Sequence, residues 1–210
     1  KRFGLKAFKV LGGAYAMARH IAERLGEDAA QLPFEVMTSA AVRQKIGEVV
    51  FATTTDGNHG RGVAWTARQL QQKAVVYMPK GSSPERLNAI RAEGAQAEIV
   101  DMNYDAAVRL TAERARQHGW QVVQDTAWEG YEKIPLWIMQ GYGTLMLEVF
   151  QQLHAVPPTH IIVPAGVGSL AAAVQAAVTA AYGAERPKVI VAEARAADCL
   201  YRSALGQSGE

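Results

Sequence analysis

Short apolar runs alternate with longer helical patterns through this 210-residue chain, and this alternation limits the possible folds more than any other feature. The runs that we interpret as strands lie at residues 49–54, 74–79, 97–102, 120–125, 160–164 and 188–194. The helical patterns lie at residues 13–25, 62–70, 83–94, 105–119, 135–152 and 169–182. Strands that are apolar along their whole length are typical of parallel sheets covered on both faces, so the pattern predicts an α/β fold. In such folds, ligands bind at the carboxyl ends of the strands.

The composition excludes several classes of function. Apolar residues make up 49% of the chain, charged residues 20%, and the formal net charge is +2. No basic run carries interleaved aromatic residues, so we expect no nucleic-acid partner. The apolar runs are far too short to span a bilayer and no signal-like segment occurs, so we expect no membrane partner. The single cysteine, Cys199, favours a reducing, cytoplasmic location, and we interpret it as structural.

One lysine has an unusual setting. Lys9 lies in the sequence AFKVLGG, just before the helix predicted at residues 13–25. Apolar neighbours disfavour an ammonium ion and lower the pKa of the amine, and a neutral amine is what imine formation requires. The alternative is an ordinary exposed loop lysine. A reactive, imine-forming Lys9 is favoured only because two further segments of the chain fit the same chemistry.

The first of these segments is DGNHGRG, at residues 56–62, between a predicted strand and a predicted helix. Its three glycines predict a backbone whose N–H groups approach a ligand closely. The side-chain amide of Asn58 is suited to donate a hydrogen bond to an oxygen on a ligand ring. The alternative is a polar turn with a structural role, and we interpret His59 as a turn or supporting residue.

The second segment is a glycine loop between an apolar strand and an alanine-rich helix. It consists of Gly166, Val167, Gly168 and Ser169. Backbone donors and the positive end of a helix dipole favour a phosphate at such a position, although tight packing alone also explains such glycines. The loop lacks the third glycine of a dinucleotide fingerprint and the Gly-Lys-Ser/Thr of a P-loop. An amine, a ring-binding turn and a phosphate loop together indicate pyridoxal phosphate, held as a Schiff base.

Two carboxylates lie at predicted strand ends. Asp56 is inside the ligand turn, and Asp125 ends the strand predicted at residues 120–125. Both are candidate catalytic acids or bases, because the carboxyl ends of parallel strands meet at one edge of a sheet. A capping or turn role is the alternative for each. We assign no metal ligands.

Seven stretches give the chain a family resemblance. They are RFGLKAFKVLGG, FATTTDGNHGRGVAW, YMPKGS, VQDTAWEGYEKIP, IMQGYGTL, AGVGS and ADCLYRS. Together they resemble the fold type II pyridoxal phosphate enzymes, the group of tryptophan synthase β and threonine dehydratase. Within that group the chain is most similar to the 2,3-diaminopropionate ammonia-lyases, because an acid, Asp56, stands before Gly-Asn-His where the dehydratases carry Ser-x-Gly-Asn-His.

The resemblance implies a cofactor site and a reaction. Lys9 would bind pyridoxal phosphate, Asn58 would contact its phenolate oxygen, and residues 166–169 would hold its phosphate. Lys9, Asp56 and Asp125 would be catalytic in the α,β-elimination of diaminopropionate to pyruvate and ammonia. The partners would be an amino acid substrate and a second copy of the chain in a homodimer.

The resemblance also implies the domain organisation. Residues 1–40 and 133–210 would belong to a larger cofactor-binding domain, and residues 41–132 would form a smaller α/β domain. Both would contain open parallel sheets. Family chains extend well beyond residue 210, and the missing part would supply the partner of the pyridine nitrogen.

Three other functions stay open. A serine or threonine dehydratase, or another β-eliminating or β-replacing enzyme of this fold, would differ in its substrates. A non-catalytic protein that binds pyridoxal phosphate would have no need for Lys9 together with both acids. A purely structural α/β module would not turn yellow with the cofactor.

Overall fold

The computed structural model describes residues 2–153 and 156–206. The chain divides into two compact units, Lys1–Gln124 and Asp125–Glu210, which we call the first and the second unit and describe separately. Among the described residues, the strands form two sheets in which every pairing between strands is parallel. The predicted α/β fold with parallel sheets is confirmed.

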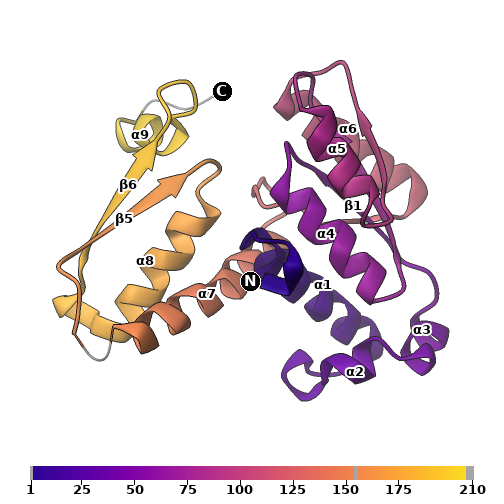
Figure 1. Ribbon diagram of the computed structural model, residues 1–210, viewed down its shortest axis with the longest axis horizontal. Coiled ribbons are helices and arrows are strands. Elements are labelled where there is room, and N and C mark those ends of the chain that lie inside the picture. The colour runs from indigo at the N-terminus through magenta and orange to yellow at the C-terminus, as the bar shows by residue number, and fades with distance from the viewer. Residues whose placement is uncertain (1, 154–155, 207–210) are drawn as a thin grey trace. The chain divides into compact units, whose positions relative to one another are not determined.

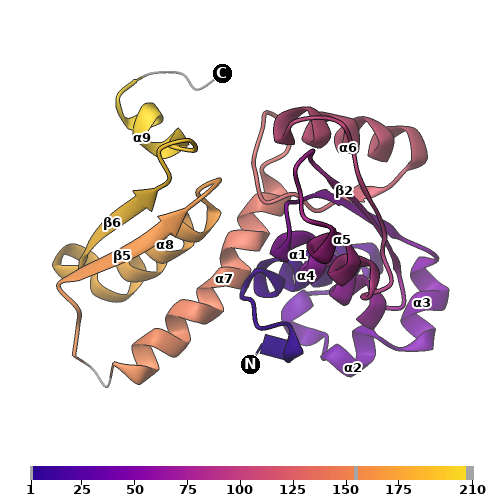
Figure 2. The same cartoon turned by 45° about the horizontal axis from the view of Figure 1, so that its top comes forward.

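The first unit contains a four-stranded sheet in the order β3-β2-β1-β4 (Figure 1). Its strands are β1 (Val50–Thr54), β2 (Lys73–Met78), β3 (Gln96–Ile99) and β4 (Gln121–Val122). Its helices are α1 (Lys9–Leu25), α2 (Phe34–Met37), α3 (Ala40–Ile46), α4 (Asn58–Gln69), α5 (Pro84–Arg91) and α6 (Tyr104–His118), with short 3-10 helices η1 (Arg2–Gly4) and η2 (Ala29–Gln31). Figure 2 shows α6 on one face of this sheet and α1, α4 and α5 on the other.

Helix α5 begins where its sequence predicts. Ser83 is the N-cap, and its Oγ accepts a hydrogen bond from the backbone N–H of Arg86 at 3.3 Å. Pro84 occupies the first helical position, where its missing N–H costs nothing. The cap therefore sets the start of α5 and places Arg86 in its first turn.

Helices α1 and α4 begin earlier than we predicted, at Lys9 and Asn58. The glycines that suggested loops lie inside these helices and face each other. A Cβ on Gly62 of α4 would lie 2.8 Å from the Cα of Val10 in α1, and a Cβ on Gly13 would lie 3.5 Å from Val63. These glycines allow two helices to approach closely, and that need is invisible in a single sequence.

Strand β4 is shorter than predicted. We expected a strand over residues 120–125, but only Gln121 and Val122 pair with β1 in the regular ladder. One further backbone bond follows, from Val123 N to Ala52 O at 2.8 Å. Beyond it, side chains take over the hydrogen bonding, as described below.

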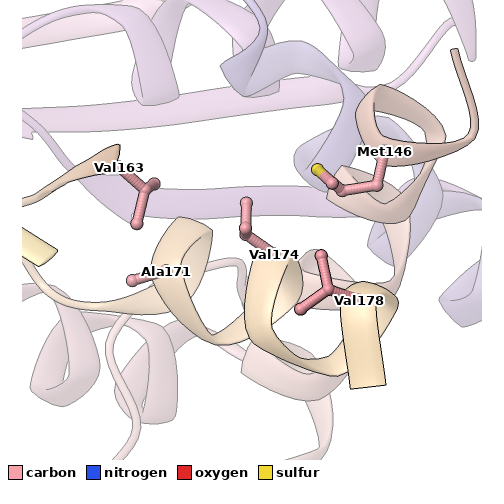
Figure 3. Close-up of a cluster of buried hydrophobic side chains, with 5 residues drawn as sticks. All are labelled: Met146, Val163, Ala171, Val174 and Val178. Atoms are coloured by element: carbon pink, nitrogen blue, oxygen red, sulfur yellow. The ribbon is translucent and has the colours of Figure 1, made fainter. Parts of the chain in front are cut away.

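In its described part, the second unit contains a two-stranded parallel sheet and four helices, one of which is a 3-10 helix. Its elements are α7 (Lys133–Gln152), β5 (His160–Ala165), α8 (Ser169–Tyr182), η3 (Gly183–Glu185), β6 (Lys188–Glu193) and α9 (Cys199–Ala204). Figure 3 shows the buried cluster that joins α7, β5 and α8, namely Met146, Val163, Ala171, Val174 and Val178. The alanine-rich face of α8 brings the helix close to its neighbours, and the valines fill the remaining space.

The structure bears on two broader expectations. No helix within residues 2–153 and 156–206 is both long and apolar enough to cross a bilayer. The division after Gln124 follows contacts within this chain alone. The larger domain of residues 1–40 and 133–210, with a smaller domain at 41–132, stays a prediction.

Candidate functional site

The residues that we singled out fall into two sets, one in each unit. Lys9, Asp56 and Asn58 lie in the first unit, whereas Asp125 and the loop at residues 166–169 lie in the second. Each set is built by the ends of neighbouring elements.

Lys9 is the first residue of α1, and its side chain is partly buried. Its Nζ atom lies 5.8 Å from the centre of the Phe8 ring. The following residue, Val10, is 1% exposed and packs against Gly62. The amine thus lies near one aromatic ring, and the α1–α4 contact fixes the start of α1 against the first turns of α4.

The glycines of the DGNHGRG segment are used for packing more than we expected. Gly60 is buried, and a Cβ there would overlap the Thr55 methyl group and lie 3.0 Å from Val76. Gly62 packs directly against the backbone of α1. Gly57 is extended, with a φ of 171°, and its N–H donates to Thr55 Oγ1 at 3.0 Å. Two of the three glycines thus serve the interior of the unit.

Asn58 opens α4 directly after this turn. Its side chain is exposed, and the N-cap residue Gly57 provides no side-chain cap for the first turn of the helix. An exposed amide beside uncapped backbone N–H groups is a polar, donor-rich surface. That surface suits the ring oxygen for which Asn58 was predicted.

Asp56 is exposed and is held by a residue that the sequence analysis missed. The Arg86 Nη1 atom donates to the Asp56 main-chain oxygen at 3.1 Å and to Asp56 Oδ2 at 3.3 Å. A Cβ on Gly57 would lie 3.3 Å from Arg86 Cδ, so the arginine stem covers this glycine. No short-range pattern links residues 30 positions apart, and only the structure shows the pair.

His59 supports the end of β4. Its ring is 5% exposed, and Nε2 lies 2.8 Å from the carbonyl oxygen of Val123. Because a carbonyl only accepts, Nε2 carries the proton. The other ring nitrogen, Nδ1, is buried without a hydrogen-bond partner among the described residues. His59 is therefore a supporting residue, as the sequence indicated.

A buried glutamine completes this support. Gln124 is 1% exposed, and its Oε1 accepts from Thr54 N at 2.9 Å and from Thr53 Oγ1 at 3.0 Å. Its Nε2 donates to the Tyr104 hydroxyl at 2.8 Å. The Gln124 side chain thus supplies the acceptor for the Thr54 N–H that a neighbouring strand would supply in a regular ladder. Sequence reasoning missed this residue, because a glutamine at a predicted strand end carries no distinctive signal.

In the second unit, Asp125 is buried, with 5% exposure. Its main-chain oxygen accepts a short hydrogen bond from Ser169 Oγ. Burial, together with the charge of Asp125, raises the pKa of the fully buried Tyr142 on α7 far above its usual value, so the phenol keeps its proton. The predicted acid is therefore anchored through its main-chain oxygen to the start of α8, and its charge acts on a phenol that stays neutral.

The glycine loop lies between β5 and α8. Gly168 has a φ of +92°, a conformation that favours glycine, and it precedes a helix that has no side-chain cap. A Cβ on Gly166 would meet nothing within 4 Å. Open space beside an uncapped helix N-terminus offers unpaired backbone N–H groups of the kind that bind a phosphate.

The segment around α9 lies against this loop. Cys199 Sγ donates to the Gly166 oxygen at 3.2 Å, and a Cβ on Gly168 would lie 3.3 Å from Leu200. Glu193 accepts hydrogen bonds from Leu200 N at 3.0 Å and Tyr201 N at 2.8 Å. The exposed Cys199 thus has the structural role that we expected of it.

These features fit pyridoxal phosphate. The glycine loop has open space beside uncapped backbone N–H groups, and the amine of Lys9 lies near the Phe8 ring. The hydroxyl hydrogen of Ser169 is used by Asp125, so backbone N–H groups are the donors that this loop offers to a phosphate.

The fold and these segments define a class of enzyme. The chain belongs to the pyridoxal-phosphate dependent enzyme family, whose profile matches residues 5–209. It is similar to the diaminopropionate ammonia-lyase of Escherichia coli strain K12, with 54% identity over 208 residues that cover 98% of this chain and 51% of that protein. The resemblance inferred from the motifs is confirmed.

Solved structures agree with this similarity. The holo form of Escherichia coli diaminopropionate ammonia lyase has a TM-score of 0.91 and 53% identity, covering 98% of this chain and 52% of that chain. The complex of the same enzyme with D-serine also has a TM-score of 0.91, with 54% identity over 97% of this chain and 52% of that one. This chain therefore spans about half the length of the relatives that it matches.

Proposed function

We propose that this protein converts 2,3-diaminopropionate and water to pyruvate and two molecules of ammonia, with pyridoxal phosphate as cofactor. The observation that carries the proposal is the 54% identity to diaminopropionate ammonia-lyase across 98% of this chain. Both acids and the lysine that we selected from the residues lie within the aligned family match at residues 5–209.

Three segments would hold the cofactor. The Lys9 amine would bind it, Asn58 would donate to its ring oxygen, and residues 166–169 would hold its phosphate through backbone N–H groups and the α8 dipole. When bound, pyridoxal phosphate supplies an electron sink that stabilises negative charge on the α-carbon of an amino acid. Gly168, in its left-handed conformation, lets the loop turn directly into α8.

The acids would move the protons. We propose that Lys9 and Asp56 serve opposite faces of the substrate, so that each removes the α-proton of one enantiomer. Asp125 would bind or protonate the β-amino group, because ammonia leaves readily only when that nitrogen is protonated. A buried carboxylate beside a neutral phenol suits a cationic amine better than an uncharged hydroxyl group.

The test is pyruvate release by the full-length natural protein, loaded with pyridoxal phosphate. The substrates are D- and L-2,3-diaminopropionate, L-serine and L-threonine. We expect fast release from diaminopropionate and little from the hydroxy amino acids. A preference for serine or threonine would instead establish a dehydratase, and no turnover by a yellow protein would favour a non-catalytic binding protein.

The Asp56 role has its own test. Asp56→Asn should slow one enantiomer of diaminopropionate, because the amide has no basic oxygen with which to take the α-proton. If both enantiomers react at the wild-type rate, Asp56 is not a base in this reaction. Asp125→Asn should slow both enantiomers, since both release the same β-amino group.

Three further features belong to this proposal. They are the larger domain of residues 1–40 and 133–210 with a smaller domain at 41–132, a homodimer, and a cytoplasmic location. Sedimentation of the full-length natural protein tests the dimer, and a single species of monomer mass would contradict it.

A further inference from the structure

Arg86 contacts the proposed base Asp56 in an unusual way. A single nitrogen, Nη1, bonds both the main-chain oxygen of Asp56, at 3.1 Å, and its carboxylate Oδ2, at 3.3 Å. The carboxylate is therefore drawn back toward its own backbone. This geometry restricts the rotation of the Asp56 side chain.

The arginine is itself held in place. It lies in the first turn of α5, where its N–H donates to the Ser83 cap. Its stem lies over Gly57, where a Cβ would come within 3.3 Å of Arg86 Cδ. Helix α5 packs against α4, so the arginine reaches the turn before α4 from a fixed support.

Neighbouring charges are engaged elsewhere. Arg61 and Arg68 of α4 both pair with Glu93, at 3.1 and 2.8 Å. Lys80 pairs with Asp101 at 2.7 Å. In the described part of the chain, the basic side chain that pairs with Asp56 is Arg86.

Stability does not explain the pair. The Arg86 and Asp56 side chains are 58% and 76% exposed, and exposed ion pairs of this kind contribute little to folding. The same contacts do, however, decide where the carboxylate points. The direction of a general base matters greatly to its rate, because proton transfer needs the two groups within hydrogen-bond reach.

We propose that Arg86 is a positioning residue that orients the Asp56 carboxylate for proton transfer with one enantiomer of the substrate. The inference rests on the proposed function, in which Asp56 is that base. Arg86 touches neither substrate nor cofactor in this role, and it acts only through Asp56.

The experiment compares three variants of the full-length, cofactor-loaded protein with wild type. They are Arg86→Gln, Asp56→Asn, and the control Lys80→Gln, which removes another exposed, ion-paired cation from the loop before α5. For each variant, kcat and KM are measured with D- and L-2,3-diaminopropionate, with and without deuterium at the α-carbon. Thermal unfolding and a crystal structure of Arg86→Gln complete the set.

We expect Asp56→Asn to identify the enantiomer that depends on it. Arg86→Gln should then lower kcat for that enantiomer about tenfold, raise its deuterium isotope effect, and leave the other enantiomer within about twofold of wild type. The crystal structure should show the Asp56 carboxylate turned away from its present direction. Lys80→Gln should match wild type in every measurement, and the unfolding temperatures of all three variants should agree.

Several results would overturn the inference. Equal loss with both enantiomers would make Arg86 merely structural, and a higher KM for both with unchanged kcat would make it a binding group for the substrate carboxylate. Wild-type kinetics of Arg86→Gln, when Asp56→Asn is selectively slow, would overturn this inference alone. Wild-type kinetics of Asp56→Asn would overturn both the inference and the proposed role of Asp56.

Discussion

The two sheets of this protein are built from similar apolar strands but are covered differently. In the first unit, Phe51 of β1 and Val76 of β2 are 0% exposed, with helices on both faces of the sheet (Figure 2). In the second unit, Ile162 of β5 is 72% exposed and its register partner Ile190 of β6 is 41% exposed. An apolar run therefore predicts a strand, but it does not predict how far the strand's own unit covers it.

The turn beside the covered sheet is also packed more tightly than the glycine loop of the second unit. In the first unit, the end of β4 is fixed by Gln124 and His59, and the glycines of the ligand turn are packed inside. In the second unit, the loop at Gly166 has open space around it. Packing in the first unit fixes the backbone of its turn, whereas the loop of the second unit leaves room for a ligand.

Cavity formation is the strongest way to test this contrast. Phe51→Ala should destabilise the first unit by about 4 kcal/mol, because it removes a fully buried ring from β1. Ile162→Ala should cost less than about 0.5 kcal/mol, because its side chain faces solvent. Urea unfolding followed by circular dichroism measures both values. Equal losses at the two positions would show that the β5 face is covered in the natural protein.

Replacing a glycine by alanine should affect stability very differently in the two glycine segments. Gly62→Ala should destabilise the protein by about 3 kcal/mol, because the new methyl group would press on the Val10 backbone. Gly166→Ala, with nothing within 4 Å, should change stability by less than about 0.5 kcal/mol. The same urea titration measures both changes in stability. A tolerated Gly62→Ala would mean that α1 and α4 separate easily.

The side chains at the end of β4 give a smaller effect. Gln124→Met keeps the volume but leaves the buried Thr54 N–H and Thr53 hydroxyl without their acceptor, at a cost of about 2 kcal/mol. Gln121→Met, in β4 itself and only partly buried, is the control and should be close to neutral. Thermal unfolding distinguishes them, and equal shifts would rule out a special role for Gln124.

High pH should affect the second unit through Tyr142. Its pKa is raised from the usual 10 by burial first and by Asp125 second. Above pH 10 the unfolded chain therefore loses the phenolic proton while the folded chain keeps it, and stability falls by about 1.4 kcal/mol per pH unit. Tyr142→Phe should remove this dependence in urea titrations between pH 9 and 11. An unchanged slope would show that the phenol ionises while folded.

Much of the fold was predictable because parallel strands must be apolar throughout and because caps such as Ser83-Pro84 act locally. The predicted starts of α1 and α4 were too late because of glycines. Gly62 looks like a helix breaker in the sequence, yet it lies where the backbone of a second helix comes too close for a side chain. That requirement belongs to tertiary packing and has no local signature.

The site was predictable where function restricts residue type. A lysine, an amide and two acids at strand ends stand out because each performs chemistry. Arg86 and Gln124 do not stand out, because they act by holding backbone oxygens and N–H groups that are distant in sequence. Such residues are recognised only once the elements that they connect are in place.

The packing of the DGNHGRG segment has a practical consequence for redesign. Gly60 and Gly62 have no space for a side chain, and His59 is locked onto a backbone carbonyl. Asp56 and Asn58 face outward instead. Randomising the whole segment would therefore fill a mutant library with unfolded protein. Substitutions at Asp56 and Asn58 should leave the fold intact, so their effects on activity report on the proposed base and the proposed cofactor contact alone.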